Sequence, residues 1–119
     1  MTLKLNHVHL KTKNPEQTAK FYVDTLGATI VGPAGTGGYR LDLHGLSLNV
    51  TQFLETQKRE QKYGMEHIAI DTDELDALVA KLEAQGINIL EQTVVSGGRR
   101  VCFFEGPDGV QLEFIEMKK

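Results

Sequence analysis

Two histidines and one glutamate are the residues of this 119-residue chain whose types and spacing best suit metal chemistry. His7 and His67 each lie in a run of alternating polar and apolar residues, and Glu113 lies in a similar run near the C-terminus. Burying neutral imidazoles beside a carboxylate is costly unless hydrogen bonds, ionisation or a metal satisfies them. Two imidazoles and a carboxylate can hold a divalent transition ion and leave positions open for substrate and water. The sequence therefore predicts a metal site made of His7, His67 and Glu113.

An internal repeat favours the two histidines as ligands. The segment around His7 aligns with the segment around His67, so these residues hold equivalent positions in two copies of one pattern. A lone histidine in a strand is more often structural, but its recurrence at equivalent positions raises the weight of a ligand role. His44 lies in a predicted turn and is interpreted as structural or surface-exposed. His9 shares a strand face with His7, so it is a possible ligand, a group supporting the ligands or a substrate contact.

The same repeat places Asn49 opposite Glu113, because Gly45–Val50 aligns with Gly109–Phe114. An asparagine side chain offers a neutral oxygen as a ligand but cannot act as a general base. Asn49 is therefore a possible fourth ligand or supporting group.

The elements that must position these residues follow the order strand, helix and three strands, written twice. Alternating patterns predict strands, and apolar residues at helical spacing predict helices. Asn14 and Asp73 are expected to cap the helices at their N-termini, and Gly27 and Gly86 are expected to end them. The predicted strands cover residues 3–12, 28–31, 39–43, 46–52, 65–72, 87–94, 99–105 and 110–117, and the helices cover 15–26 and 74–85.

These elements predict an α+β fold of two βαβββ modules, with curved mixed sheets around a concave metal site. The prediction is a single domain over residues 1–119: module one at about 1–54, a polar linker at about 55–63 and module two at about 64–119. Because strand side chains alternate between faces, the apolar positions should pack beneath the helices and the polar positions should share the opposite face. Glu66 and Glu116 have the wrong parity for that face and are interpreted as solvated.

Composition narrows the classes of function. The formal charge is −3 and the basic residues are scattered, which argues against a nucleic-acid partner. No stretch approaches the length of a membrane span. The single cysteine, Cys102, lies among apolar residues and is expected to be a buried, inert thiol. With no signal-peptide pattern, the expectation is a cytoplasmic protein.

Four motifs resemble the vicinal oxygen chelate (VOC) superfamily, which includes glyoxalase I, extradiol dioxygenases and bleomycin-resistance proteins. The first motif runs through Asn6-His7-Val8-His9-Leu10, and the second through Phe21-Tyr22 and Leu26-Gly27. The third is Glu66-His67-Ile68-Ala69. The most specific is Gly106-Pro107-Asp108-Gly109-Val110-Gln111-Leu112-Glu113, a turn that leads into a strand carrying a carboxylate. The similarity covers nearly the whole chain.

The resemblance implies metal ligands at four matching positions: His7, Asn49, His67 and Glu113. Asn49 departs from the pattern, because relatives similar to glyoxalase I usually carry a carboxylate there. Glu113 would then have to do any proton transfer alone, which makes it the candidate catalytic residue. The remaining set of two histidines and one carboxylate resembles the family's dioxygenases or thiol transferases, whereas the short chain resembles its lyases and resistance proteins.

The leading functional hypothesis is an enzyme, a dioxygenase or a lyase, in which Fe²⁺, Mn²⁺, Ni²⁺ or Zn²⁺ polarises a small vicinally oxygenated substrate. The alternative is a metal-free small-molecule-binding protein of the bleomycin-resistance type. Arg40, Arg99 and Phe103 are weaker candidates for substrate contacts, because solvated arginines and core aromatics are common in strands. The resemblance also implies a homodimer.

Overall fold

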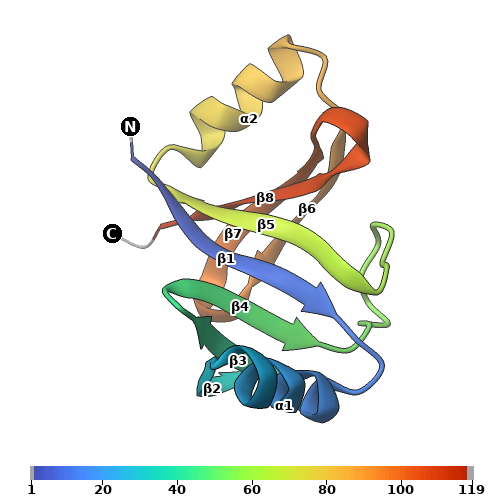
Figure 1. The fold of residues 1–119 in the computed structure, drawn as a ribbon. Coiled ribbons are helices and arrows are strands. Elements are labelled where there is room, and N and C mark those ends of the chain that lie inside the picture. Colours follow the sequence, from blue (N-terminus) through green and yellow to red (C-terminus); the bar gives the residue numbers. More distant parts are fainter. Residues whose placement is uncertain (1, 118–119) are drawn as a thin grey trace. The chain divides into compact units, whose positions relative to one another are not determined.

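A computed structural model describes residues 2–117 of the chain, with two α-helices and eight strands among them (Figure 1). The elements are β1 (Leu3–Lys11), α1 (Pro15–Leu26), β2 (Thr29–Ala34), β3 (Gly38–Leu43), β4 (Leu46–Thr51), β5 (Gly64–Thr72), α2 (Leu75–Ala84), β6 (Ile89–Val95), β7 (Arg99–Glu105) and β8 (Gln111–Glu116). This order confirms the predicted α+β class and the two βαβββ modules. Within the described residues, neither helix has the length and apolar character that crossing a bilayer requires.

The chain divides into two compact units, which are described separately. The 7–66 unit comprises His7–Glu66, and the 67–119 unit comprises His67–Lys119 together with Met1–Asn6. Strand β1 therefore contributes its first residues to one unit and the rest, from His7 onward, to the other.

The 7–66 unit contains strands in the order β2-β3-β4-β1, with α1 packed along them (Figure 1). Strand β1 pairs with β4 in parallel, and the other two pairings are antiparallel. The apolar positions predicted from strand alternation are buried: Val8, Leu10, Leu48 and Val50. The sheet is mixed, as predicted.

Helix α1 begins and ends at the predicted residues. The Asn14 side chain accepts a hydrogen bond from the Gln17 backbone N–H at 3.0 Å, and Pro15 occupies the first helical position. Gly27 follows the helix in the left-handed region, with φ of 77°, and its N–H donates to the Val23 carbonyl. This helix can therefore be placed from local sequence alone.

The 67–119 unit contains strands in the order β5-β8-β7-β6, which are labelled in Figure 1. Strand β5 pairs with β8 in parallel, and the remaining pairs are antiparallel. One hydrophobic cluster joins α2 to its sheet and consists of Leu75, Leu78, Leu82, Cys102, Phe104 and Phe114. A second cluster consists of Ala69, Val101, Phe103 and Ile115. Successive residues of β7 and β8 alternate between the clusters, as strand geometry requires. The face opposite α2 therefore carries apolar side chains as well as the polar ones that the sequence predicts.

The expected cap of α2 is wrong. The N-cap residue is Glu74, and its side chain makes no capping hydrogen bond. The Asp73 carboxylate instead accepts from the Thr2 backbone N–H at 2.8 Å, a contact that also lowers the pKa of Asp73. Thr2, which is far away in the sequence, thus donates to the carboxylate that the local pattern predicts as the cap of the helix.

Gly38 opens β3 at a point where the backbone leaves no room for a side chain. A Cβ there would collide with the carbonyl oxygen of Ala34 and lie 2.8 Å from that of Val50. Because both obstacles are backbone atoms of paired strands, Gly38→Ala should lower the free energy of unfolding by about 1–3 kcal/mol. Urea denaturation tests this, with Gly35→Ala as control, since no atom lies within 4 Å of a Cβ there. Gly35→Ala carries only the strain of a left-handed backbone, since its φ is 58°. A loss at Gly38 no larger than that of a control with this strain alone would contradict the steric explanation.

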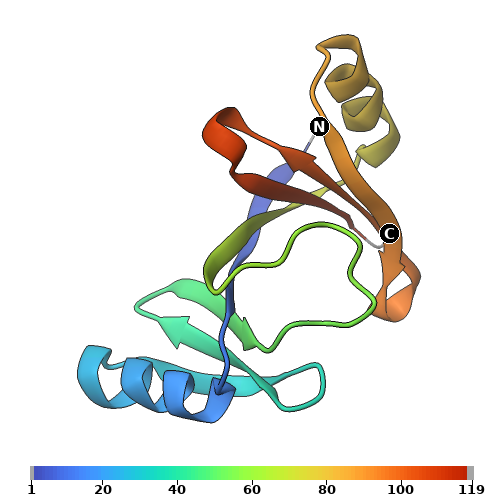
Figure 2. The ribbon, with the colours of Figure 1, turned by 90° about the vertical axis from the view of Figure 1, so that its right-hand side faces the viewer.

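Glu66 is buried rather than solvated, because the polar segment before it folds back over it. Only 2 % of Glu66 is exposed, and its Oε1 lies 2.9 Å from Arg59 Nη1. Gln57 donates to its other oxygen at 3.3 Å. The 52–63 segment, green in Figure 2, thus supplies buried partners and is not only a solvated connection.

Lys11 belongs to the same buried cluster, with 2 % of the residue exposed. Its Nζ donates to the Gln52 carbonyl oxygen at 3.3 Å and to Gln57 Oε1 at 3.4 Å. Burial lowers the pKa of Lys11, and Arg59 lowers it further, although Glu66 opposes the shift.

This lowered pKa predicts a pH-dependent term in stability. The unfolded chain binds the Lys11 proton more tightly than the folded chain does, so stability from this group rises with pH up to the ordinary lysine value of 10.5. Lys11→Met should remove that rise. Comparing free energies of unfolding of both proteins between pH 7 and pH 10 isolates the term. Parallel curves for the two proteins would contradict it.

Candidate functional site

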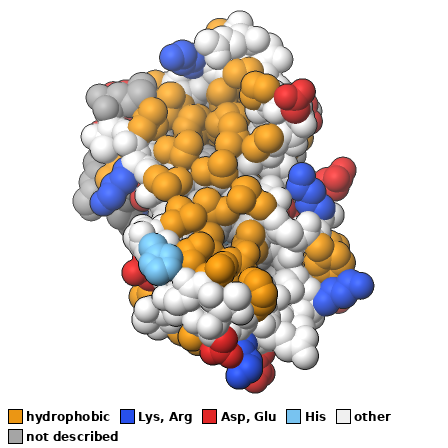
Figure 3. Space-filling view, in the orientation of Figure 1, with side chains coloured by type: hydrophobic (Ala, Val, Ile, Leu, Met, Phe, Trp, Pro, Cys, Tyr) orange, Lys and Arg blue, Asp and Glu red, His pale blue; other side chains and the backbone are white. Residues whose placement is uncertain are grey.

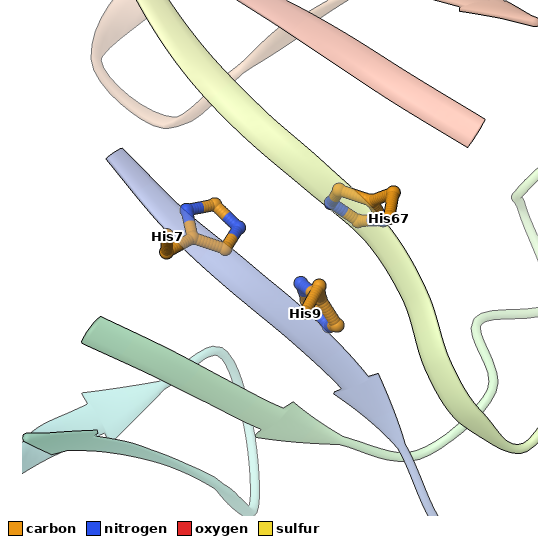
Figure 4. A group of neighbouring side chains, drawn as sticks. All are labelled: His7, His9 and His67. Atoms are coloured by element: carbon orange, nitrogen blue, oxygen red, sulfur yellow. The ribbon is translucent and has the colours of Figure 1, made fainter. Parts of the chain in front are cut away.

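His7 and His9 lie on one face of β1 in the 7–66 unit, with ring centroids 5.6 Å apart (Figure 4). His7 is buried, with 8 % of the residue exposed, and His9 is half-buried. Alternation along a strand places residues two apart on the same side, so this pairing follows directly from the sequence. The pair offers neutral imidazole nitrogens, which are common metal ligands.

Asn49 lies beside His9 on the neighbouring strand, because β1 and β4 pair in parallel with these two residues in register. His9 Nε2 is 2.7 Å from the hydroxyl oxygen of Thr51, two residues further along β4. A histidine that binds a metal commonly uses its second ring nitrogen for such a hydrogen bond. The Thr51 contact would orient the His9 ring if this histidine bound a metal ion. Thr51 was not expected at the site, although its spacing from Asn49 places it on the same face.

His67 and Glu113 form the corresponding pair in the 67–119 unit. His67 Nε2 lies 3.2 Å from Glu113 Oε1, and both side chains are buried, with 4 % and 6 % exposed. Neighbouring ligands of an octahedral ion with bonds of about 2.1 Å are about 3 Å apart. The distance therefore fits two ligands of one ion as well as it fits a hydrogen bond.

Strand register explains why these two side chains meet. Glu113 pairs with Ala69 across the parallel β5–β8 ladder, and His67 pairs with Gln111 two residues earlier on each strand. Ala69 is completely buried and its methyl group occupies little space beside the carboxylate. His67 and Glu113 are diagonal neighbours on one face, a placement within reach of long side chains. His67, like His7 and His9, carries ring nitrogens that can bind a metal ion (Figure 4).

Phe103 packs beside this pair. It lies in register with Glu113 across β7 and β8, and its ring meets the His67 ring edge-on with centroids 5.2 Å apart. Phe103 is buried, with 5 % exposed, so it limits access of water to the imidazole. The next residue in the sequence, Phe104, belongs instead to the hydrophobic cluster that joins α2 to its sheet.

The arginines considered as substrate contacts lie in different surroundings. Arg40 is exposed, is in register with Asn49 and donates from Nε to the Pro33 carbonyl oxygen at 3.2 Å. Arg99 is half-buried at the first position of β7.

Arg100 is held by ion pairs that the sequence did not reveal. Its nitrogens lie 2.9 Å from Asp76 and 2.6 Å from Glu116. The guanidinium lowers the pKa of both carboxyl groups. Glu116 is therefore an ion-pair residue, and Arg100 already has two acidic partners within its own unit.

The sequence predicts no role in the candidate chemistry for His44 and Cys102. His44 is exposed in a turn, with φ of 51°, and its Nε2 is 2.7 Å from the Leu26 carbonyl oxygen. Cys102 is fully buried, and burial raises the pKa of its thiol. The predicted exposure of His44 and the predicted burial of Cys102 are confirmed.

Comparisons with known proteins agree with this architecture. The model of the Glyoxalase/Bleomycin resistance protein/Dioxygenase superfamily matches residues 4–114. A lactoylglutathione lyase of Haemophilus influenzae is 28 % identical over 98 % of this chain and 94 % of its own length. One from Neisseria meningitidis serogroup A is 26 % identical over 98 % of this chain and 92 % of its own.

Solved structures show the same fold. A hypothetical protein from Bacillus halodurans has a TM-score of 0.80 at 19 % identity, covering 100 % of this chain and 97 % of the other. Methylmalonyl-CoA epimerase from Mycobacterium tuberculosis has a TM-score of 0.73 at 20 % identity, covering 98 % and 89 %. Together with the strand order and the matched span, these findings show that the chain belongs to the Glyoxalase/Bleomycin resistance protein/Dioxygenase superfamily.

Proposed function

We propose that this chain is a metal-dependent enzyme that moves a proton next to a carbonyl group in a small substrate with neighbouring oxygens. His7, His67 and Glu113 would hold the divalent ion, which would be Fe²⁺, Mn²⁺, Ni²⁺ or Zn²⁺. The observation that carries the proposal is the buried His67–Glu113 pair, with 3.2 Å between nitrogen and oxygen. Its donors suit a borderline divalent ion in charge and type.

The chemistry of the side chains assigns the roles. When bound, the ion would act as a Lewis acid that stabilises negative charge on substrate oxygens. Glu113 has a second carboxylate oxygen beyond the one near His67, and this oxygen can accept a proton from the substrate carbon. Asn49 cannot do so, because an amide is not a base at neutral pH. Phe103 shields the imidazole and would favour a dry site.

Lyase-type chemistry is preferred here over oxygen chemistry. Curated relatives named lactoylglutathione lyase align along almost the entire chain, and solved structures with this fold include methylmalonyl-CoA epimerase. These similarities support the proposal without fixing the substrate. His9 and Asn49 would support the ligands or add a fourth, since both lie on the face that carries His7.

The test is carbon–hydrogen exchange in deuterated water, using protein purified without a polyhistidine tag and loaded in turn with each ion. Lactoylglutathione and methylmalonyl-CoA serve as probes, and deuterium next to the carbonyl is measured by NMR. Glu113→Gln should slow the exchange by about 10²–10⁴-fold, as expected for loss of a general base. Failure of the chain to bind any of the four ions would overturn the proposal and favour the metal-free binding protein.

We also propose that the chain forms a homodimer. Hydrophobic side chains gather at the surface of one face (Figure 3). On β1, Leu3 and Leu5 are 53 % and 54 % exposed. Apolar surface of this kind often marks an interface. Light scattering coupled to size-exclusion chromatography should give the mass of two chains, and Leu5→Glu should shift it toward one. A single-chain mass for the unaltered protein would contradict the dimer.

A further inference from the structure

The 7–66 unit contains a solvent-open pocket that none of the proposed metal ligands lines. Its volume is about 550 Å³, within the range of about 300–1,000 Å³ typical of small-molecule sites. The pocket is formed by the end of β1, one side of α1 and the start of β5. Its lining residues are Leu10, Lys11, Thr12, Lys13, Thr18, Tyr22, Tyr63, Gly64 and Met65.

Aromatic and aliphatic groups make up much of the wall. Tyr63 stacks on Phe53, with ring centroids 4.3 Å apart and an interplanar angle of 19°. This stacking fixes one face of the Tyr63 ring. Tyr22, on α1, supplies a second aromatic ring to the lining. Flat apolar groups bind well between such side chains.

The charged residues of the lining are both lysines. Lys13 Nζ lies 5.5 Å from the centroid of the Tyr63 ring, so its charge is at the aromatic wall. Lys11 is buried and is oriented by the Gln52 carbonyl oxygen and Gln57. Glu66, the carboxylate near Lys11, is paired with Arg59 at 2.9 Å and is not part of the lining.

We propose that this pocket binds a small organic anion with a flat apolar body, such as an aromatic carboxylate. The rings and the Leu10 and Met65 side chains would cover the body, and Lys13 would face the carboxylate from the pocket rim. Two hydroxyls, those of Thr12 and Thr18, lie 2.6 Å apart in the lining and offer hydrogen bonds to a polar substituent. This site is independent of the proposed metal-dependent reaction.

A pair of probes that differ in one charge tests the proposal. The probes are 2-naphthoate and 2-naphthamide, titrated into ¹⁵N-labelled full-length chain and followed by two-dimensional NMR. We expect saturable shifts at the backbone amides of Thr12, Lys13, Tyr63 and Gly64, and tighter binding of naphthoate by about fivefold, as one partly exposed ion pair would give. Equal affinities for both probes, or shifts spread over the exposed hydrophobic residues of other elements, would overturn it.

Variants separate charge from shape. Lys13→Met should abolish the preference for naphthoate, whereas Lys13→Arg should retain it. Lys20→Met is the matched control, because Lys20 is exposed on α1, pairs with Asp24 and does not line the pocket. Tyr63→Ala should weaken both probes together. His67→Ala should change neither affinity, so failure of the metal proposal leaves this result readable. A preference for naphthoate that survives Lys13→Met would overturn the role of Lys13.

Discussion

Arg59→Met should lower the free energy of unfolding by about 3–5 kcal/mol, the largest stability loss expected in this chain. The Arg59 and Glu66 side chains are 6 % and 0 % exposed, and 2.9 Å separates Nη1 from Oε1. Removing the guanidinium leaves a buried carboxylate with less compensation, and methionine cannot supply the lost hydrogen bond. Equilibrium urea denaturation at pH 7 measures the loss, with a chelator present so that bound metal does not add stability.

A double-mutant cycle identifies the source of that loss. Glu66→Gln keeps the shape and an acceptor for Gln57 but removes the charge that faces Arg59. If the ion pair carries the effect, the double variant should be destabilised by less than the sum of the two single variants. Lys20→Met breaks an exposed pair with Asp24 and should cost under about 0.5 kcal/mol. A loss below about 1 kcal/mol for Arg59→Met would show that water reaches Glu66 in solution.

This ion pair also marks a limit of sequence-based reasoning. The 55–63 segment is polar, and polarity together with its place between two copies of a repeat predicts a solvated linker. Nothing local shows that Arg59 will turn inward, because its partner follows seven positions later at the start of a strand. Glu66 was assigned to solvent by strand parity alone. Parity tells which face a side chain occupies, but it does not tell what covers that face.

Other parts of the fold could be predicted from the sequence because the interactions that define them are local. Asn14, Pro15 and Gly27 define α1 through capping and backbone preference, and all three act within a few residues. Asp73 has the same kind of signal, yet its carboxylate is taken by the backbone of Thr2. The Asp73 carboxylate accepts from a donor distant in sequence, whereas the Asn14 side chain accepts from Gln17 in its own helix.

In the candidate site too, local patterns predict which residues take part, but long-range strand pairing sets their neighbours. Alternation and repetition led to His7, His67 and Glu113 without any knowledge of register. That Glu113 lies beside Ala69, and that Phe103 meets the His67 ring, depends on how three strands align, which the sequence does not state. The exposed Arg40 and the ion-paired Arg100 show that a basic residue in a strand says little about substrate binding.

His67→Ala should weaken binding of Zn²⁺ or Ni²⁺ by about 100-fold or more, since even groups that only support a ligand are worth about 10–100-fold. The proposal also assigns His7 as a ligand, so His7→Ala should have a similar effect. His44→Ala is the matched control, because it removes one histidine that is exposed and bonded to a backbone oxygen. Competition with a chromogenic chelator measures each affinity.

Two further variants resolve the supporting residues. Asn49→Ala and His9→Gln each remove one neighbour on the face that carries His7, and the larger loss of affinity identifies the fourth ligand. His9→Gln should also free the Thr51 hydroxyl. If His67→Ala and His44→Ala weakened binding equally, the ion would be held by scattered surface histidines. The buried His67–Glu113 pair would then be a structural hydrogen bond, and the 3.2 Å between its atoms would have no catalytic meaning.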